Sequence, residues 1–142
     1  MFILVDIDHT LSNAFWRNSM IGVEAWDDYH AASIKDKPFI KMIRLINRLN
    51  YVGYTIIALT GRTEKFRKLT IEWLVYNEVD INEILMRPDD CFIKNAAMKI
   101  QLIKQRFDGI YKNIHFLIDD NEDTCIAFSE LGITTLQVRN IA

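Results

Sequence analysis

The chain has 142 residues, a formal net charge of −2, and a composition that is half hydrophobic and one quarter charged. This length favours a single domain, residues 1–142, and the composition is that of an ordinary globular protein. The small net charge gives no general attraction to nucleic acid or membrane, although it leaves room for a local basic patch.

No apolar segment approaches the roughly 20 residues that a membrane helix requires, so no membrane association is expected. The N-terminus lacks the basic region and the cleavage site of a signal peptide, so none is expected there either. Cys91 and Cys125 have no paired spacing that suggests zinc or a disulfide. We therefore expect buried free thiols and a cytoplasmic location.

The first strand is predicted at residues 2–5, where a continuous apolar run ends abruptly in Asp6 and Asp8. Such a run is typical of a buried parallel strand whose carboxyl end opens into a site. The next segment, residues 11–37, has no strong periodicity, and we expect a loop with a short helix near residues 23–31. A segment of this length rarely supports its own core, so it is predicted to be a flap over the site and not a separate domain.

Helices and strands alternate along the rest of the chain. Pro38 is expected in the first turn of a helix, and Asn95 is expected to cap another. This alternation predicts an α/β fold, a parallel sheet with helices on both faces. The predicted strands are residues 54–59, 83–86, 114–118 and 134–138, and the predicted helices are residues 38–49, 63–74, 95–107 and 122–131.

Carboxylates follow two of the predicted strands directly. If these strands are neighbours, four negatively charged groups lie close together. The repulsion between two such groups about 4 Å apart costs roughly 4 kcal/mol at an effective dielectric constant of about 20. A cation is therefore expected, and oxygen ligands at a strand end suit Mg²⁺. The four groups are Asp6, Asp8, Asp119 and Asp120.

Other residues at the strand ends complement a phosphate group. Thr60 supplies a hydroxyl, and Gly61 lets the backbone N–H approach an anion closely. Lys99 supplies positive charge, and Arg62 or Arg17 can clamp phosphate oxygens bidentately. The assembly predicts a phosphoryl-transfer site, in which one carboxylate forms an aspartyl phosphate. The other carboxylate would protonate the leaving oxygen and later activate water.

Four motifs, in order along essentially the whole chain, resemble those of haloacid dehalogenase (HAD) superfamily phosphatases. The first is Asp-x-Asp-x-Thr at residues 6–10, and the second is a hydrophobic strand ending in Thr60. The third is a lysine, for which Lys99 has better spacing than Lys94, and the fourth is the acidic pair at residues 119–120. This resemblance implies a three-layer Rossmann-like parallel sheet of about five strands, in the order 5-4-1-2-3, without a cap domain.

The resemblance also assigns roles to these residues. Asp6 would be the nucleophile, Asp8 the general acid/base, and Thr60 and Lys99 would hold the phosphoryl group. Mg²⁺ would lie among the Asp6 side chain, the Asp8 backbone carbonyl and the acidic pair Asp119/Asp120, with the direct ligand within that pair left open.

Within the superfamily, the sequence resembles the 3′-phosphatase domain of phage-type polynucleotide kinases and its small stand-alone relatives. In that group, arginines that match Arg17 and Arg62 serve the site. The chain departs from the pattern at His9, usually glycine, and at Asn95, usually an aspartate that pairs with the motif lysine. His9 either touches substrate or fills the space of the missing glycine. The supporting segments are residues 26–27, 36–38, 60–62 and 85–88.

The leading hypothesis is a Mg²⁺-dependent phosphomonoesterase acting on a nucleotide or a nucleic-acid 3′-phosphate end. A site that is covered by a flap and not by a cap domain should be open to solvent, so it can admit a substrate as large as a nucleic acid. The alternatives are a 5′-nucleotidase-like or broad small-molecule phosphatase, a receiver-like phospho-accepting domain, and a non-catalytic binding module. A receiver needs an acceptor aspartate on a middle strand, and residues 86–88 offer none. An oligomer is possible, but the sequence does not indicate one.

Overall fold

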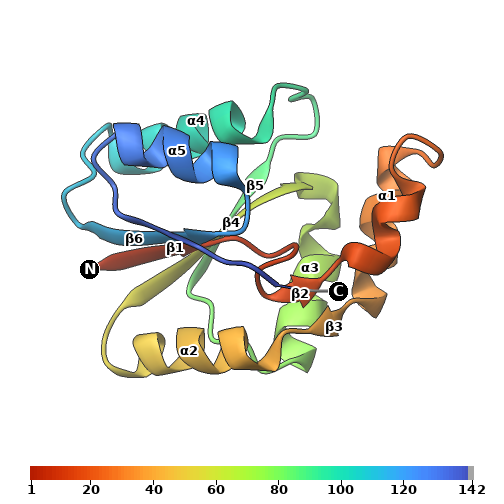
Figure 1. Ribbon diagram of the computed structural model, residues 1–142, viewed down its shortest axis with the longest axis horizontal. Coiled ribbons are helices and arrows are strands. Elements are labelled where there is room, and N and C mark those ends of the chain that lie inside the picture. The colour runs from red at the N-terminus through yellow and green to blue at the C-terminus, as the bar shows by residue number, and fades with distance from the viewer. Residues whose placement is uncertain (141–142) are drawn as a thin grey trace.

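The computed structural model describes residues 1–140, and its centre is a five-stranded parallel sheet in the order β5-β4-β1-β6-β7 (Figure 1). This order is the predicted one, and the α/β fold without a cap domain is confirmed. The strands are β1 (Phe2–Val5), β4 (Thr55–Thr63), β5 (Glu83–Arg87), β6 (Ile114–Asp119) and β7 (Thr135–Gln137).

Two helices cover each face of the sheet, α4 and α5 above it and α2 and α3 below it in the view of Figure 1. Successive side chains of a strand point to opposite faces. Ile3 and Val5 of β1 accordingly pack with α2 and α3, whereas Leu4 between them packs with α4 and α5. The continuous apolar run of β1 is therefore buried on both sides. The helices are α2 (Ile40–Tyr51), α3 (Arg67–Tyr76), α4 (Asn95–Phe107) and α5 (Glu122–Glu130).

The strand register aligns the carboxyl ends of the three central strands. Val5 lies opposite Ala58 of β4 and opposite Ile118 of β6. The backbone N–H of Asp6 then donates to the Ile118 carbonyl at 2.9 Å, which places Asp6 beside Asp119. Polar residues that are more than a hundred positions apart in the sequence thus meet at one edge of the sheet.

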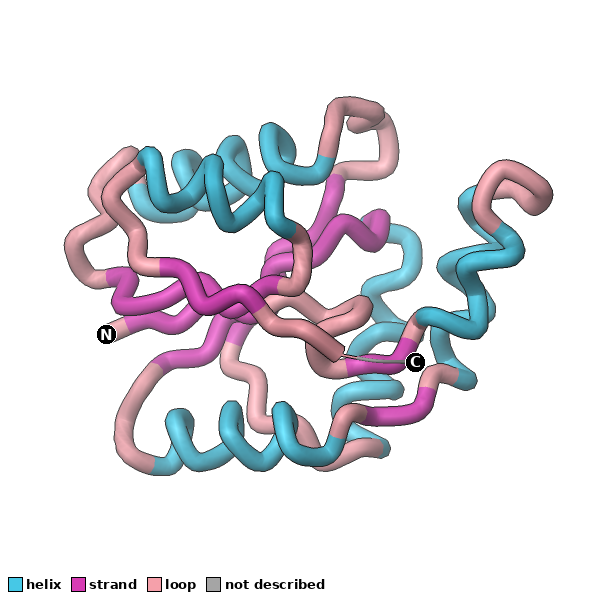
Figure 2. The backbone as a smooth tube through the Cα atoms, in the orientation of Figure 1, coloured by secondary structure: helices cyan, strands magenta, loops and turns pink. Residues whose placement is uncertain are grey.

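Residues 11–37, the flap, form an extension at the carboxyl edge of the sheet (Figure 2). Its base is a two-stranded antiparallel ladder, in which Ser12 pairs with Pro38. The expected short helix is present as α1, at the end of the predicted range. The flap elements are β2 (Ser12–Asn13), η1 (Phe15–Met20), α1 (Trp26–Ala31) and η2 (Ala32–Lys35), and β3 (Lys37–Pro38) closes the ladder.

Three predicted helix starts differ from the structure. Thr63 is still part of β4, and α3 begins only at Arg67, after a 3-10 turn at Glu64–Phe66. Pro38 lies in β3 and not in a helix, because the Phe39 N–H donates to the Leu11 carbonyl at 2.8 Å and α2 begins only at Ile40. Asn95 is the first residue of α4 and not its cap, because its side-chain oxygen accepts a hydrogen bond from Arg87 instead of from the helix.

Both cysteines are free, with Cys125 buried and Cys91 half-buried. Within residues 1–140, none of the helices has the length and hydrophobicity that a membrane span requires.

Candidate active site

Three carboxylates meet where β1 and β6 end. Asp6, Asp119 and Asp120 each offer one oxygen, and these oxygens lie within 4.8 Å of one another. Burial, and then the charge of Asp119, raise the pKa of Asp6 well above its usual range, and burial likewise raises the pKa of Asp120. A compact, buried set of oxygen donors with mutual repulsion fits a hard divalent cation such as Mg²⁺.

Lys99 reaches this cluster from α4. Its Nζ donates to Oδ1 of Asp6 at 2.9 Å and to Oδ2 of Asp119 at 2.7 Å, and its side chain is buried. Burial disfavours the ammonium, but the two carboxylates outweigh it and raise the pKa of Lys99 above its usual range. Lys94 is exposed, so the structure brings Lys99, and not Lys94, to the carboxylates.

Asp8 has a different setting, because two arginines hold its carboxylate. Arg62 donates from Nη2 to Oδ1 at 2.7 Å, and Arg17 donates from Nη2 to the same oxygen at 2.9 Å. Burial acts to raise the pKa of Asp8, but the charges and hydrogen bonds of Arg62, and then Arg17, bring it well below its usual range. The pKa values of Asp6 and Asp8, which are separated by one residue, are therefore shifted in opposite directions.

Arg17 and Arg62 were expected to clamp a phosphate. Both side chains are 0% exposed, and neither belongs to the residues that line the cavity described below. Arg62 also donates to Thr70 Oγ1 at 3.3 Å, and Arg17 also donates to the Tyr29 carbonyl at 3.1 Å. In this structure both guanidinium groups fix Asp8.

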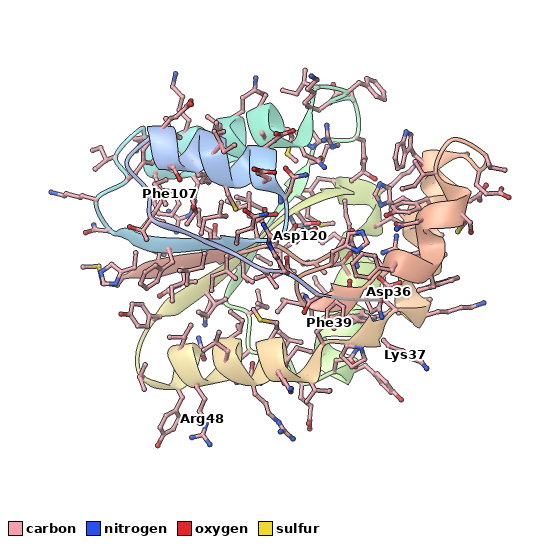
Figure 3. All side chains as sticks on the ribbon, in the orientation of Figure 1. Asp36, Lys37, Phe39, Arg48, Phe107 and Asp120 are labelled. Atoms are coloured by element: carbon pink, nitrogen blue, oxygen red, sulfur yellow. The ribbon has the colours of Figure 1, made fainter. Side chains whose placement is uncertain are left out.

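Asp36 completes this arrangement, although no role in the site was predicted for it. Its carboxylate accepts hydrogen bonds from Arg17 Nε at 2.8 Å and Nη2 at 2.6 Å, and from Trp16 Nε1 at 2.8 Å. Asp36 is buried whereas the neighbouring Lys37 is exposed (Figure 3). The only sequence signal was its place in the segment 36–38, since a buried aspartate in an aperiodic flap has no pattern of its own.

Thr60 and Gly61 lie inside β4, which continues to Thr63, beyond the strand end predicted at residue 59. The Thr60 side chain is buried, and its Oγ1 accepts a hydrogen bond from the Arg62 N–H at 3.1 Å. A Cβ on Gly61 would lie 2.6 Å from Oδ1 of Asn95, so the absence of a side chain admits Asn95. Arg87 binds both partners, donating to the Gly61 carbonyl at 3.2 Å and to Oδ1 of Asn95.

His9 follows Asp8 with a left-handed backbone, at a φ of 66°. This conformation favours glycine, which explains the usual residue at this position. The His9 ring packs against Phe15 with centroids 4.4 Å apart, and the His9 carbonyl accepts a hydrogen bond from Asn140 at 2.8 Å. The residue both fills space and lines the cavity.

A cavity of about 520 Å³ opens above the carboxylates. Its floor holds Asp6, Asp8 and Lys99, and its walls come from the flap and from the loop between β5 and α4. The flap contributes His30, whose pKa is lowered to about 4, chiefly by burial. Other residues of the walls are Trp26, Tyr29, Lys65, Arg87, Phe92 and Lys94.

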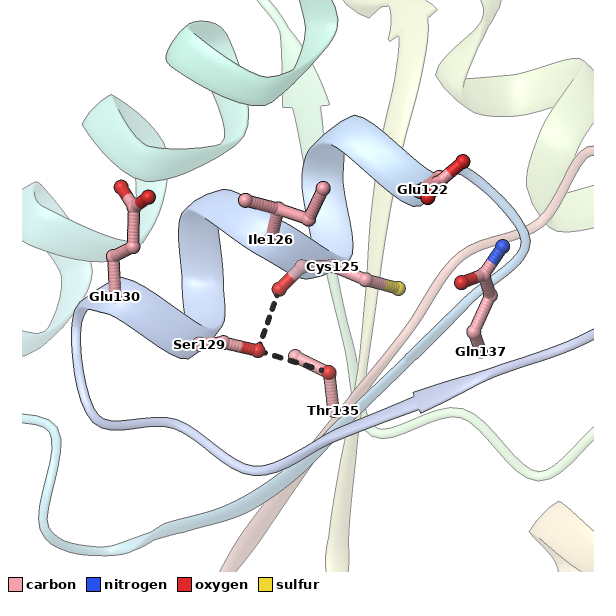
Figure 4. A pocket seen from close by; sticks show the side chains of 7 residues that line it. All are labelled: Glu122, Cys125, Ile126, Ser129, Glu130, Thr135 and Gln137. Carbon is pink, nitrogen blue, oxygen red and sulfur yellow. Dashed lines mark hydrogen bonds between the residues drawn. The ribbon is translucent and has the colours of Figure 1, made fainter.

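A second concavity lies between α5 and β7, and it shares none of the residues that line the first (Figure 4). Ser129 Oγ donates to the Cys125 carbonyl at 2.8 Å and lies 3.2 Å from Thr135 Oγ1. Its two hydroxyls thus pair with groups of the protein itself.

Comparisons with known proteins agree with this geometry. The family model described as "Polynucleotide kinase PNKP phosphatase domain" matches residues 1–141. No curated protein sequence matches the chain.

Solved structures share the fold. The Pnkp1 chain of a Pnkp1/Rnl/Hen1 RNA repair complex superposes with a TM-score of 0.81 at 24% identity, over 96% of this chain and 42% of that chain. This chain therefore spans less than half of that relative. L-2-haloacid dehalogenase from Xanthobacter autotrophicus gives a TM-score of 0.70 at 7% identity, over 100% and 79% of the two chains.

A variant of an HAD-family enzyme from Bacteroides thetaiotaomicron, solved with magnesium and inorganic phosphate, gives a TM-score of 0.63 at 15% identity, over 96% of this chain and 93% of that chain. The family match over nearly the full length, together with paired aspartates, a buried lysine and an acidic pair in one cavity, leads to a single assignment. The chain belongs to the PNKP phosphatase-domain family of the HAD superfamily, and it is a phosphatase.

Proposed function

We propose that this phosphatase is a Mg²⁺-dependent phosphomonoesterase that forms an aspartyl phosphate on Asp6 and acts on a nucleic-acid 3′-phosphate end. The observation that carries the mechanism is the difference between the partners of Asp6 and those of Asp8. Asp6 lies with Lys99 in the carboxylate cluster, whereas Asp8 is held ionised by two arginines. One site thus holds a nucleophile and a separate proton acceptor.

In the first step, an Asp6 oxygen forms a bond to phosphorus and the bond to the leaving oxygen breaks. Lys99, 2.9 Å from Asp6, is placed to bind a phosphoryl oxygen as negative charge gathers there. Mg²⁺ held by Asp6, Asp119, Asp120 and the Asp8 carbonyl would neutralise the clustered carboxylates and phosphoryl oxygens.

In the second step, water attacks phosphorus and releases Asp6. Asp8 is ionised in the free protein, which suits it to accept the proton of that water. The leaving oxygen of the first step takes its proton from Asp8 after the bound phosphate monoester or solvent has protonated this carboxylate, and the attacking water of the second step returns a proton to Asp8. Arg17 and Arg62 act as positioning residues here, since both hold the Asp8 carboxylate.

The family description supports a polynucleotide substrate, and the structure of Pnkp1 in an RNA repair complex is consistent with it for that relative. The cavity adds a physical reason, because exposed aromatic and basic side chains stand around its mouth. A nucleoside monophosphate is the second candidate, since a cavity of about 520 Å³ accommodates one as well.

The test compares phosphate release, with Mg²⁺, from a 3′-phosphorylated oligonucleotide, a 5′-phosphorylated oligonucleotide, 3′- and 5′-mononucleotides and p-nitrophenyl phosphate. We expect the highest kcat/KM for the 3′-phosphorylated oligonucleotide. Equal or higher kcat/KM values for the mononucleotides would show that the substrate is a nucleoside monophosphate and not a nucleic-acid end. Absence of phosphate release from all five would contradict the phosphomonoesterase itself.

A further inference from the structure

Two large aromatic side chains stand exposed at the mouth of the cavity, on different walls. Trp26 of α1 is 61% exposed, and Phe92 of the loop between β5 and α4 is 91% exposed. Figure 1 shows that α1 and this loop both lie at the carboxyl edge of the sheet. Exposed rings are unfavourable in water, and their concentration beside a polar site is typical of a binding surface.

The loop that carries Phe92 is fixed by one side chain. Arg87 Nη1 donates to the carbonyls of Cys91 at 3.1 Å and Ile93 at 2.6 Å, the two residues that flank Phe92. Arg87 Nε also donates to the Gly61 carbonyl, which ties the loop to the end of β4. Phe92 is therefore held out to solvent by an ordered backbone, which is the arrangement of a preformed contact.

Trp26 is held in a similar way by its neighbours in the flap. Its ring meets Tyr29 edge-on, with centroids 5.4 Å apart, and lies at 26° to the ring of His30. Because Tyr29 and His30 are buried, they support the indole from the protein side. On both walls of the mouth, an exposed aromatic ring is thus held in place by ordered neighbouring groups.

A basic residue follows Phe92 by two positions and lines the same cavity. Lys94 is exposed, lines the cavity, and makes no ion pair with any residue in the described part of the chain. Lys65 joins the two walls, because its ammonium pairs with Asp27 of α1 and its backbone N–H donates to Oδ1 of Asp89, in the loop of Phe92, at 2.9 Å. The free cation therefore lies on the wall of Phe92.

We propose that Trp26 and Phe92 make this enzyme select a single-stranded polynucleotide over a mononucleotide. Each ring stacks on an unpaired base that precedes the terminal 3′-phosphate, and Lys94 binds a phosphodiester of the same strand. Aromatic rings bind unstacked bases of any sequence, and bases inside a duplex are not available to them. This inference rests on the proposed function for the placement of the terminal phosphate at Asp6.

The experiment measures kcat/KM for a 3′-phosphorylated single-stranded oligonucleotide and for a 3′-mononucleotide. In Phe92→Ala and in Trp26→Ala, the oligonucleotide-to-mononucleotide ratio should fall about 10-fold, the scale of alanine substitutions at stacking residues. Phe92→Trp should restore most of the ratio, since it keeps an aromatic face. Tyr51→Ala is the matched control, because Tyr51 is 85% exposed at the end of α2 and does not line the cavity.

A second measurement tests the strand and the lysine. The wild type should prefer the single strand to a blunt duplex with the same 3′-phosphate, and Lys94→Gln should reduce the salt dependence of oligonucleotide kcat/KM by about one phosphate contact. Wild-type ratios in both alanine variants, or equal use of the blunt duplex, would overturn the inference while leaving the proposed function intact. A wild type that does not act on the oligonucleotide would overturn both.

Discussion

Asp36 carries the charge that balances Arg17, and we predict that Asp36→Asn destabilises the protein by about 3–5 kcal/mol. The side chains of Arg17, Arg62 and Asp36 are all 0% exposed. Two guanidinium groups face two carboxylates there, Asp8 and Asp36. The amide removes one negative charge and leaves a buried positive charge without compensation.

The size of this loss of stability depends on which contacts of Asp36 the asparagine side chain can still make. An amide oxygen in the place of Oδ1 can still accept the two hydrogen bonds from Trp16 and Arg17 Nε, so the backbone course of the flap should survive. The cost is therefore that of the uncompensated charge. Since about 1 kcal/mol shifts the melting temperature of a chain of this size by roughly 4 °C, we expect a decrease of roughly 10–20 °C.

Urea unfolding followed by tryptophan fluorescence measures this cost. The matched control is Asp27→Asn, which breaks an ion pair with Lys65 whose side chains are 57% and 47% exposed. Exposed pairs contribute little, so the control should cost less than about 1 kcal/mol. If Asp36→Asn costs no more than Asp27→Asn, the buried arginines do not depend on Asp36 and the reasoning is refuted.

Three further changes test other parts of the site. Burial lowers the pKa of His30 from 6.5 to about 4, so the unfolded chain binds a proton that the folded chain does not, and stability is lost as the pH falls through this range. When the pH is lowered from about 7.5 to about 5, the free energy of unfolding measured with urea should decrease by about 2 kcal/mol less in His30→Phe than in the wild type. Equal decreases would contradict a lowered pKa of His30. Gly61→Ala should displace Asn95 from Arg87 and cost about 1–2 kcal/mol; Asn95→Ala in the same chain should remove most of this cost, whereas additive costs would show that the two sites are independent. Mg²⁺ should raise the melting temperature of the wild type but not of Asp119→Asn, and an equal rise in both would place the ion elsewhere.

The sheet could be predicted from sequence because its signals are local. Each central strand is a short apolar run, and the polar residues that end it appear in the sequence at the same point. The motif resemblance supplied the strand order, which depends on long-range pairing. Pro38 shows the limit of local reasoning, since its pairing with Ser12 and the hydrogen bond from Phe39 to Leu11 join positions that are far apart in the chain.

The site could be predicted as a set of residue types more readily than as a set of contacts. Arg17 and Arg62 were expected at the site as clamps for phosphate oxygens, but nothing in the sequence indicated that their donors are used on Asp8 itself. The partner of Arg17 is Asp36, 19 positions away in a segment without periodicity. Such pairings arise from tertiary packing, and a single sequence carries no periodic trace of them.

If Asp6 is the nucleophile, turnover passes through a phosphoryl group that is covalently bound to Asp6, and this intermediate can be detected. Turnover with p-nitrophenyl phosphate and Mg²⁺ is quenched with acid, and the tryptic peptide ending at Arg17 is analysed by mass spectrometry. We predict a phosphoryl adduct on Asp6, and its loss together with phosphate release in Asp6→Asn. An adduct that maps to Asp8, or wild-type phosphate release by Asp6→Asn, would contradict the mechanism.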